Sequence, residues 1–179
     1  MKMDKINVLE KNFKENQTSQ NLIKYLLAFP YYQRFEIFWD MYCEGEIVDE
    51  KVIYDAAKIV YGVASDNVEE FREIFDCIDG CFSDEDLKTY KHLRNNIKLY
   101  RATTEDEIES GEIGISWTRR KSVAKKFQHE YYNDSVERNI YSITVPKNRI
   151  KAIIDEFDEF EVILTDVEPD EVELEENLY

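Results

Sequence analysis

The chain has few of the residues that interrupt regular secondary structure. Its 179 residues include only five glycines and three prolines, which excludes collagen-like repeats and glycine- or proline-rich linkers. Three cysteines, an odd number, do not build a disulfide framework. No run of 18 apolar residues is present, and the polar first 25 residues carry no secretory pattern. We therefore expect a protein of the reducing cytoplasm, without a membrane-spanning segment.

Basic residues are outnumbered. The 39 acidic and 23 basic side chains give a formal net charge of −16. A field of this sign repels phosphates, so general binding to a nucleic-acid backbone is disfavoured, whereas attraction to a basic partner is favoured. Hydrophobic residues make up 43% of the chain and aromatic residues 13%. This excludes a wholly disordered chain and suits one domain, or a small domain with a helical extension.

The first half of the chain has helical periodicity. Residues 1–16 lack a sustained period and are expected to fray. Beyond them, apolar residues recur at helical spacing up to about residue 96. Asp66 and Glu69 have the spacing of a capping box. Five helical stripes, interpreted as packing faces, are expected at 22–27, 35–42, 52–60, 66–78 and 83–93.

The pattern changes at residue 97 to short alternating segments. Their spacing does not fit regular βαβ units, so the fold class is expected to be α+β: a helical region at 1–96, then a strand-rich region at 97–179. Strands are expected at 97–102, 113–118, 139–145, 151–154 and 160–165, with short helices at 104–111, bracketed by Thr104 and Glu107, and at 121–131.

The charge is also uneven along the strand-rich region. Residues 98–151 hold 11 basic and eight acidic side chains, whereas the stretch from Asp155 onward holds 12 acidic side chains and no basic one. The favoured interpretation of that acidic stretch is a solvated, partly disordered tail.

Common motifs for phosphate and metal binding are absent. Neither a P-loop pattern nor a G-x-G-x-x-G pattern is present, and no nucleophile elbow appears. The spacing of the residues alone does not exclude a hydrolase of the Ser-His-Asp or Cys-His kind. Cys77 and Cys81 lie four residues apart, but a metal site needs further ligands. His92 and His129 do not lie at the close sequence spacing that is typical of such ligands. We interpret these cysteines as buried free thiols and expect no metal site.

Three features of the strand-rich region combine into one pattern. Tyr100-Arg101 lies near the end of the first expected strand, and Ser116-Trp117-Thr118 ends the second. Phe157-x-Glu159-x-Glu161 leads into the last. Strand alternation places both glutamates on one face, which is costly unless a cation or a reaction uses them. The alternative interpretation is an exposed acidic start of a strand.

These motifs, in this order, resemble the mono-ADP-ribosyltransferases of the Arg-Ser-Glu type, and in particular bacterial and phage members. The resemblance covers about residues 97–167. It implies a compact split-β-sheet core that transfers ADP-ribose from NAD, the substrate, to a macromolecular acceptor, with protein favoured and arginine as an option. The sequence departs from the family where Ala102 follows the arginine, since many relatives have glycine there. The helical first half is not part of the family pattern.

The chemistry of cleaving NAD assigns roles to the matching residues. Glu161 is the expected catalytic carboxylate, since breaking the nicotinamide–ribose bond builds positive charge on the ribose. Arg101 suits the pyrophosphate, which a guanidinium grips with two hydrogen bonds. Ser116 is expected to orient Glu161 and to help hold NAD.

Other residues are expected to support this site. Thr118 would support the strand end, and Tyr100 belongs with Arg101 to the expected NAD-binding set. Glu159 resembles the family residue that activates an arginine acceptor. Trp117 is expected to pack beneath the site. The basic residues of 119–126 either draw the dinucleotide in or form a solvated helix face.

Two other functions stay open from the sequence. With water in place of the acceptor, the same site would make an NAD glycohydrolase. From a different class, a non-catalytic acidic protein would bind or inhibit a basic or nucleic-acid-binding partner. Only an enzyme needs Arg101 and Glu161 to point into one cleft.

Overall fold

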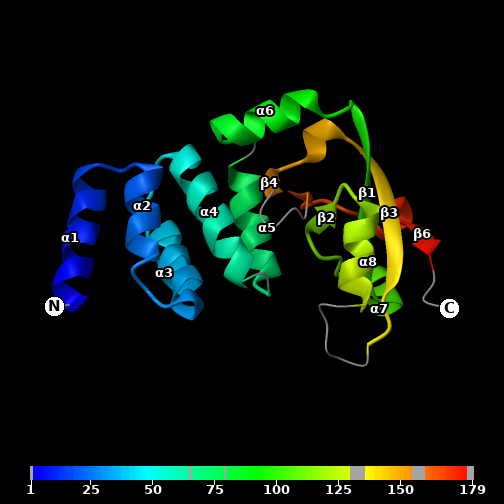
Figure 1. Cartoon of the computed structure of the whole chain (residues 1–179), viewed down its shortest axis with the longest axis horizontal. Helices are drawn as coiled ribbons and strands as arrows, with labels where there is room; N and C mark the ends of the chain where they lie inside the picture. The colour runs from blue at the N-terminus through cyan, green and yellow to red at the C-terminus, as the bar shows by residue number, and fades with distance from the viewer. Residues whose placement is uncertain (1, 65, 79, 130–135, 155–159, 177–179) are drawn as a thin grey trace. The chain divides into compact units, whose positions relative to one another are not determined.

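The chain folds as two compact units, Met1–Ser83 and Asp84–Tyr179, of which the first is helical and the second contains a β-sheet (Figure 1). The computed structural model describes residues 2–64, 66–78, 80–129, 136–154 and 160–176. Helices and a sheet that are segregated along the chain make this an α+β protein, as the sequence predicts.

The first unit is built from five helices whose apolar stripes face inward. They are α1 (Lys2–Glu15), α2 (Ser19–Leu26), α3 (Tyr31–Cys43), α4 (Glu50–Ala64) and α5 (Val68–Cys77). Thr18 caps α2 by accepting a hydrogen bond from the Asn21 amide. Gly45, with φ of +69°, follows the end of α3.

Two expectations for this unit are wrong. The first residues do not fray: they form α1, which packs on α2 and buries Phe13 completely. The helix α5 is not capped by Asp66, because its N-cap is Asn67, whose side chain makes no capping hydrogen bond. Its amide instead donates to the Ala64 carbonyl at the end of the preceding helix.

A cluster of aromatic rings holds α3, α4 and α5 together. Phe71 is fully buried, and its ring centroid lies 4.9 Å from those of Phe35 and Tyr61. Phe75, also fully buried, stacks on it at 6.2 Å. Aromatic pairs of this geometry stabilise a core beyond the area they bury, so Phe71 is the centre of the first unit's core.

The second unit begins one helix earlier than the sequence analysis expects. The helix α6 belongs to it, because α6 packs on β4 and the Lys147 ammonium lies 5.0 Å from the Tyr90 ring centroid. The unit consists of α6 (Asp84–His92), β1 (Asn96–Thr103), α7 (Glu105–Ser110), β2 (Ser116–Thr118), α8 (Lys121–His129), β3 (Asn139–Pro146), β4 (Ala152–Ile154), β5 (Glu161–Ile163) and β6 (Glu173–Glu176), with 3-10 turns at Lys147–Arg149 and Pro169–Glu171.

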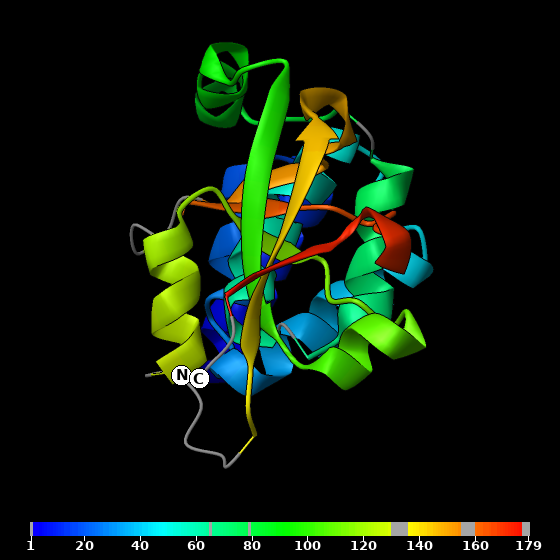
Figure 2. The ribbon, with the colours of Figure 1, turned by 90° about the vertical axis from the view of Figure 1, so that its right-hand side faces the viewer.

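The described strands form one antiparallel sheet in the order β4-β5-β2-β1-β3-β6. β1 and β3, which run side by side in Figure 2, pair over eight residues. In contrast, β1 and β2 pair only at Tyr100 and Thr118. The sheet therefore consists of two three-stranded parts, β4-β5-β2 and β1-β3-β6, connected at a narrow junction.

The acidic stretch is not a free tail, contrary to the favoured interpretation of the sequence. Its described residues supply β5 and β6, two strands of the sheet. Glu175 accepts a hydrogen bond from Lys98 of β1, and Glu176 forms ion pairs with Lys121 and Lys125 of α8. Acidic side chains of β6 thus neutralise the basic residues of the region before it.

Phe71→Ala should lower the free energy of unfolding of the first unit by about 3–5 kcal/mol, because it opens a cavity at the centre of a packed cluster. The variant is best measured by urea unfolding in a Trp117→Phe background, where Trp39 of α3 is the single tryptophan and its fluorescence is excited selectively. Tyr32→Ala, at a position that is 67% exposed, serves as control and should change the value by less than about 0.5 kcal/mol. Equal losses in the two variants would contradict this account of the core.

Candidate functional site

The candidate site lies at the narrow junction of β1 and β2. Past Tyr100 and Thr118 the two strands stop pairing, and a side chain replaces the backbone ladder. The Arg101 Nη1 donates to the main-chain carbonyl of Ser116 at 2.9 Å. A buried backbone carbonyl without a hydrogen-bond partner is energetically costly. The hydrogen bond from Arg101 gives the Ser116 carbonyl the partner that β1 does not provide beyond its pairing with β2.

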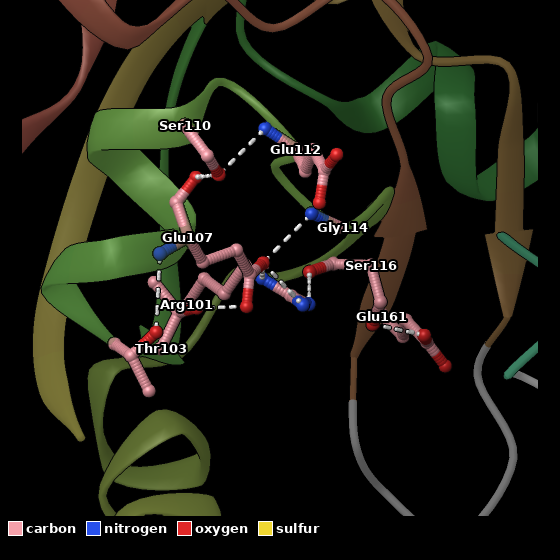
Figure 3. Close-up of polar contacts among 9 residues, drawn as sticks. Arg101, Thr103, Glu107, Ser110, Glu112, Gly114, Ser116 and Glu161 are labelled. Carbon is pink, nitrogen blue, oxygen red and sulfur yellow. Dashed lines mark hydrogen bonds and ion pairs between the residues drawn. The ribbon is translucent and has the colours of Figure 1, made fainter. Parts of the chain in front are cut away.

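A second contact fixes the guanidinium of Arg101. Its Nε and Nη2 donate to Oε1 of Glu107, at 3.1 and 2.9 Å (Figure 3). The two side chains are 21% and 25% exposed, so the ion pair is partly shielded from water. Such a charge-assisted pair is stronger than a neutral hydrogen bond and fixes the orientation of the guanidinium.

Glu107 stands in α7 and gathers four hydrogen bonds. Besides the two from Arg101, its carboxylate accepts the Thr103 hydroxyl of β1 and the Gly114 amide, the latter at 2.8 Å. Burial favours a raised pKa for the Glu107 carboxyl, but the Arg101 charge and these hydrogen bonds outweigh burial. The pKa is therefore lowered from its ordinary value, and the ionised form is the one that holds the junction.

The loop from α7 to β2 brings Gly114 against the guanidinium. Thr104 caps α7 by accepting from the Glu107 amide, and Gly111, at φ +78°, ends the helix in the left-handed region. At Gly114 an added Cβ would lie 2.6 Å from Cζ of Arg101, closer than atoms approach. Only glycine therefore leaves room for the guanidinium to lie where it does.

Ser116 connects this arrangement to Glu161. Its hydroxyl donates to a carboxylate oxygen of Glu161, which is half-buried at the start of β5. In Figure 3, Ser116 lies between Arg101 and Glu161, with its carbonyl toward the first and its hydroxyl toward the second. The structure thus brings the three expected residues into one continuous set of contacts.

The turn before Glu161 is held in an unusual conformation. Among the described residues, Phe160 is the one non-glycine residue with positive φ, at 52°. Its carbonyl accepts from the Arg119 amide at 3.1 Å, and the Arg120 guanidinium lies 3.3 Å from its ring centroid. Strained backbone of this kind persists only where neighbouring contacts enforce it. Here those contacts come from the residues just after β2, and they fix the entry of the chain into β5.

The register places most of the expected site residues on one face of the sheet. Tyr100 pairs with Thr118, and Thr118 pairs with Glu161. Residues directly opposite each other share a face, and Ser116 joins them by strand alternation. Thr118 also accepts a hydrogen bond from the Arg120 amide, which turns the chain into α8.

Arg101 reaches the site from the other face. It follows Tyr100 in β1, so alternation assigns it to the face of Leu99 and Thr103. The long side chain turns to β2 where pairing ends and touches Ser116 at the carbonyl. Arg101 therefore contacts Glu161 indirectly, through the two polar groups of Ser116. Strand alternation assigns the two side chains to opposite faces of the sheet, which differs from the expectation that both point into one cleft.

Three expectations lie apart from this network. Glu159, with Phe157 of the same motif, lies outside the described residues. Lys121 and Lys125 are ion-paired with Glu176. Trp117 is 1% exposed, which confirms that it packs in the core.

The sequence analysis missed Glu107 and Gly114 as site residues. Glu107 had a local explanation, because its spacing from Thr104 is that of a short capped helix. The structure confirms the cap, yet only the backbone amide of Glu107 serves it. The available signal was an acidic residue six positions after Arg101, followed by a glycine two positions before Ser116-Trp117-Thr118.

The interpretation of the cysteines is wrong in part. Cys77 ends α5 and is exposed, and Cys81 lies beyond the helix, half-buried, with its thiol donating to Glu50 at 3.0 Å. Over the described ranges, no group of three or more histidine, cysteine, aspartate or glutamate side chains is placed to hold a metal ion.

Comparisons of the chain with protein-family models, with curated proteins and with solved structures gave no match. None of the helices in the described part of the chain is both long and apolar enough to cross a membrane.

The pH dependence of stability tests the role of the ionised Glu107. Its lowered pKa contributes stability that is fully present above the ordinary value of 4.5 and is lost as pH falls through the folded-state pKa. At pH 7, Glu107→Gln should cost about 1–3 kcal/mol of unfolding free energy, as for other hydrogen bonds to charged groups. The difference from the unmodified protein should shrink steadily below pH 4.5.

The matched control for this experiment is Glu109→Gln, an exposed position of the same helix. It removes the same charge and should leave the stability profile parallel to that of the unmodified protein. A Glu107→Gln deficit that does not change between pH 7 and pH 3 would contradict the ionic role.

Proposed function

We propose that this protein is an NAD-dependent mono-ADP-ribosyltransferase that modifies a protein acceptor. The observation that carries the proposal is the hydrogen bond from Ser116 of β2 to Glu161 of the neighbouring strand β5. It joins the serine and the glutamate of the Arg-Ser-Glu pattern, which are 45 residues apart in the chain. The narrow junction also supports a core of the split-sheet kind, because it nearly separates the sheet into two parts.

Glu161 is the proposed catalytic residue. Loss of nicotinamide from NAD leaves an oxocarbenium-like ribose, and a carboxylate beside it stabilises the growing positive charge. The Ser116 hydroxyl, donating to one carboxylate oxygen, restricts the rotation of the side chain. A preorganised charge of this kind does not have to reorient during the reaction, which is where its catalytic value lies.

Arg101 is proposed to combine a structural role with binding of the pyrophosphate. A guanidinium carries five N–H groups. Contacts with Glu107 and with the Ser116 carbonyl use three of them, which leaves two that the described residues do not use. Tyr100 and Thr118 share a face with Glu161, so they are the proposed neighbours of the bound nucleotide.

A second candidate is a non-catalytic acidic protein that binds a basic partner. The net charge of −16 favours it, since such a field attracts cationic surfaces. NAD glycohydrolase activity is the other enzymatic outcome, with water as the acceptor. The experiments below separate the three by measuring nicotinamide release and acceptor labelling together.

Glu161→Gln should abolish both activities. The change keeps the shape and the hydrogen bond from Ser116 but removes the charge, and loss of one preorganised electrostatic contact typically costs about a hundredfold or more in rate. The measurement is nicotinamide release from labelled NAD, with and without a cell lysate as acceptor. Glu173→Gln, an exposed change in the same acidic stretch, is the matched control and should retain full activity.

Unmodified protein that releases no nicotinamide under either condition would exclude both enzymatic functions and leave the acidic binding protein. Release without labelling of any lysate protein would favour the glycohydrolase.

Glu159→Gln should separate transfer from hydrolysis. Its proposed task is to activate the acceptor, so labelling of protein should fall at least about tenfold while nicotinamide release in buffer persists. Mass spectrometry of the labelled acceptor identifies the modified side chain. Equal loss of both activities would contradict this division of labour between the two glutamates, without excluding the enzyme.

A further inference from the structure

Glu107 draws three separate parts of the second unit to one carboxylate. It stands in α7, accepts from Arg101 and Thr103 of β1, and accepts from the Gly114 amide of the loop that leads into β2. Two strands that barely pair with each other are thus tied through one side chain. The Glu107 side chain is 25% exposed, so these contacts are partly shielded from water.

Gly114 provides an independent observation of the same arrangement. Its backbone approaches the guanidinium so closely that a methyl group would lie 2.6 Å from Arg101 Cζ. The loop and the arginine are therefore packed face to face, and Glu107 binds both, through the Gly114 amide and through Nε and Nη2 of Arg101. The guanidinium occupies the space that a side chain at Gly114 would need, and the contacts with Glu107 hold it there.

The position of the Arg101 guanidinium affects Glu161 through one residue, Ser116. Arg101 holds the carbonyl of Ser116, and the hydroxyl of the same Ser116 holds Glu161. A rotation of the Ser116 peptide would therefore redirect its hydroxyl. Misplacing a reacting group by about 1 Å can lower the rate about a hundredfold.

We infer that Glu107 is a positioning residue of the proposed reaction: it locks Arg101 onto the Ser116 carbonyl, so that the Ser116 hydroxyl is aligned on Glu161. The inference rests on the proposed function. Glu107 does not touch the reacting atoms. It acts through Arg101 and Ser116, and its effect is on the turnover of bound NAD.

The test is a double-mutant cycle on nicotinamide release, with kcat and KM measured separately. Glu107→Gln should lower kcat about tenfold or more, whereas Glu109→Gln should leave it unchanged. The Ser116→Ala background lacks the hydroxyl that is to be aligned. In this background, Glu107→Gln should lower kcat further by less than about threefold. A residue needed only for folding would reduce the active fraction equally in both backgrounds.

Gly114→Ala tests the same lock with the Glu107 charge in place, and it keeps the inference testable if Glu107→Gln folds poorly by circular dichroism. The added methyl displaces the guanidinium, so kcat should fall as it does in Glu107→Gln, and again less in the Ser116→Ala background. Full kcat in Glu107→Gln or Gly114→Ala, or equal effects in both backgrounds, would overturn the inference. Unmodified protein that releases no nicotinamide overturns the proposed function first, and this inference with it.

Discussion

The single backbone pair between β1 and β2 is the constraint on which the candidate site depends. β2 pairs with β5 along its whole length, but on its edge toward β1 it has one register pair, so the Ser116 carbonyl on that edge needs a donor from elsewhere. Arg101 supplies that donor, and Glu107 holds Arg101 in place. The break in the ladder thus leaves a main-chain carbonyl to be satisfied by side chains, and the contacts of Arg101 and Glu107 lie at this break.

Several basic side chains of the second unit have acidic partners within the same unit. Lys98, Lys121 and Lys125 are neutralised by β6. Arg149 is held by Asp166 and by Glu171. These ion pairs connect β6 to β1 and α8, and they connect the 3-10 turn at Lys147–Arg149 to the residues around Pro169–Glu171.

The elements that the sequence predicts well are those stabilised by their own residues. Helices with strong apolar stripes, and the strand β1 with its alternation, follow from local patterns. The helix α1 was missed because its stability comes from burying Phe13 rather than from periodicity. The strand β6 was missed because Glu173–Glu176 has no strand propensity, and its ion pairs come from β1 and α8.

The site follows the same division. Arg101, Ser116 and Glu161 were singled out because their three motifs occur in an order that resembles the Arg-Ser-Glu pattern. Their register was not predictable, since it depends on pairing across 45 residues of chain. Glu107 was hidden by a sufficient local explanation, the cap of α7, and its use by Arg101 is a property of the packed unit.

The strand order also determines when the site can assemble as the chain folds. The helices of the first unit pack on sequence neighbours, α1 on α2 and α3 on α4, and contacts of this kind form early. In contrast, β2 lies between β1 and β5. Its edge toward β5 pairs with residues about 45 positions later in the chain. Bringing β2 and β5 together costs conformational entropy of the intervening chain before any contact between the two strands forms. The Ser116–Glu161 contact therefore belongs to the late steps of folding, and mutations there should leave the folding rate largely unchanged while they speed unfolding.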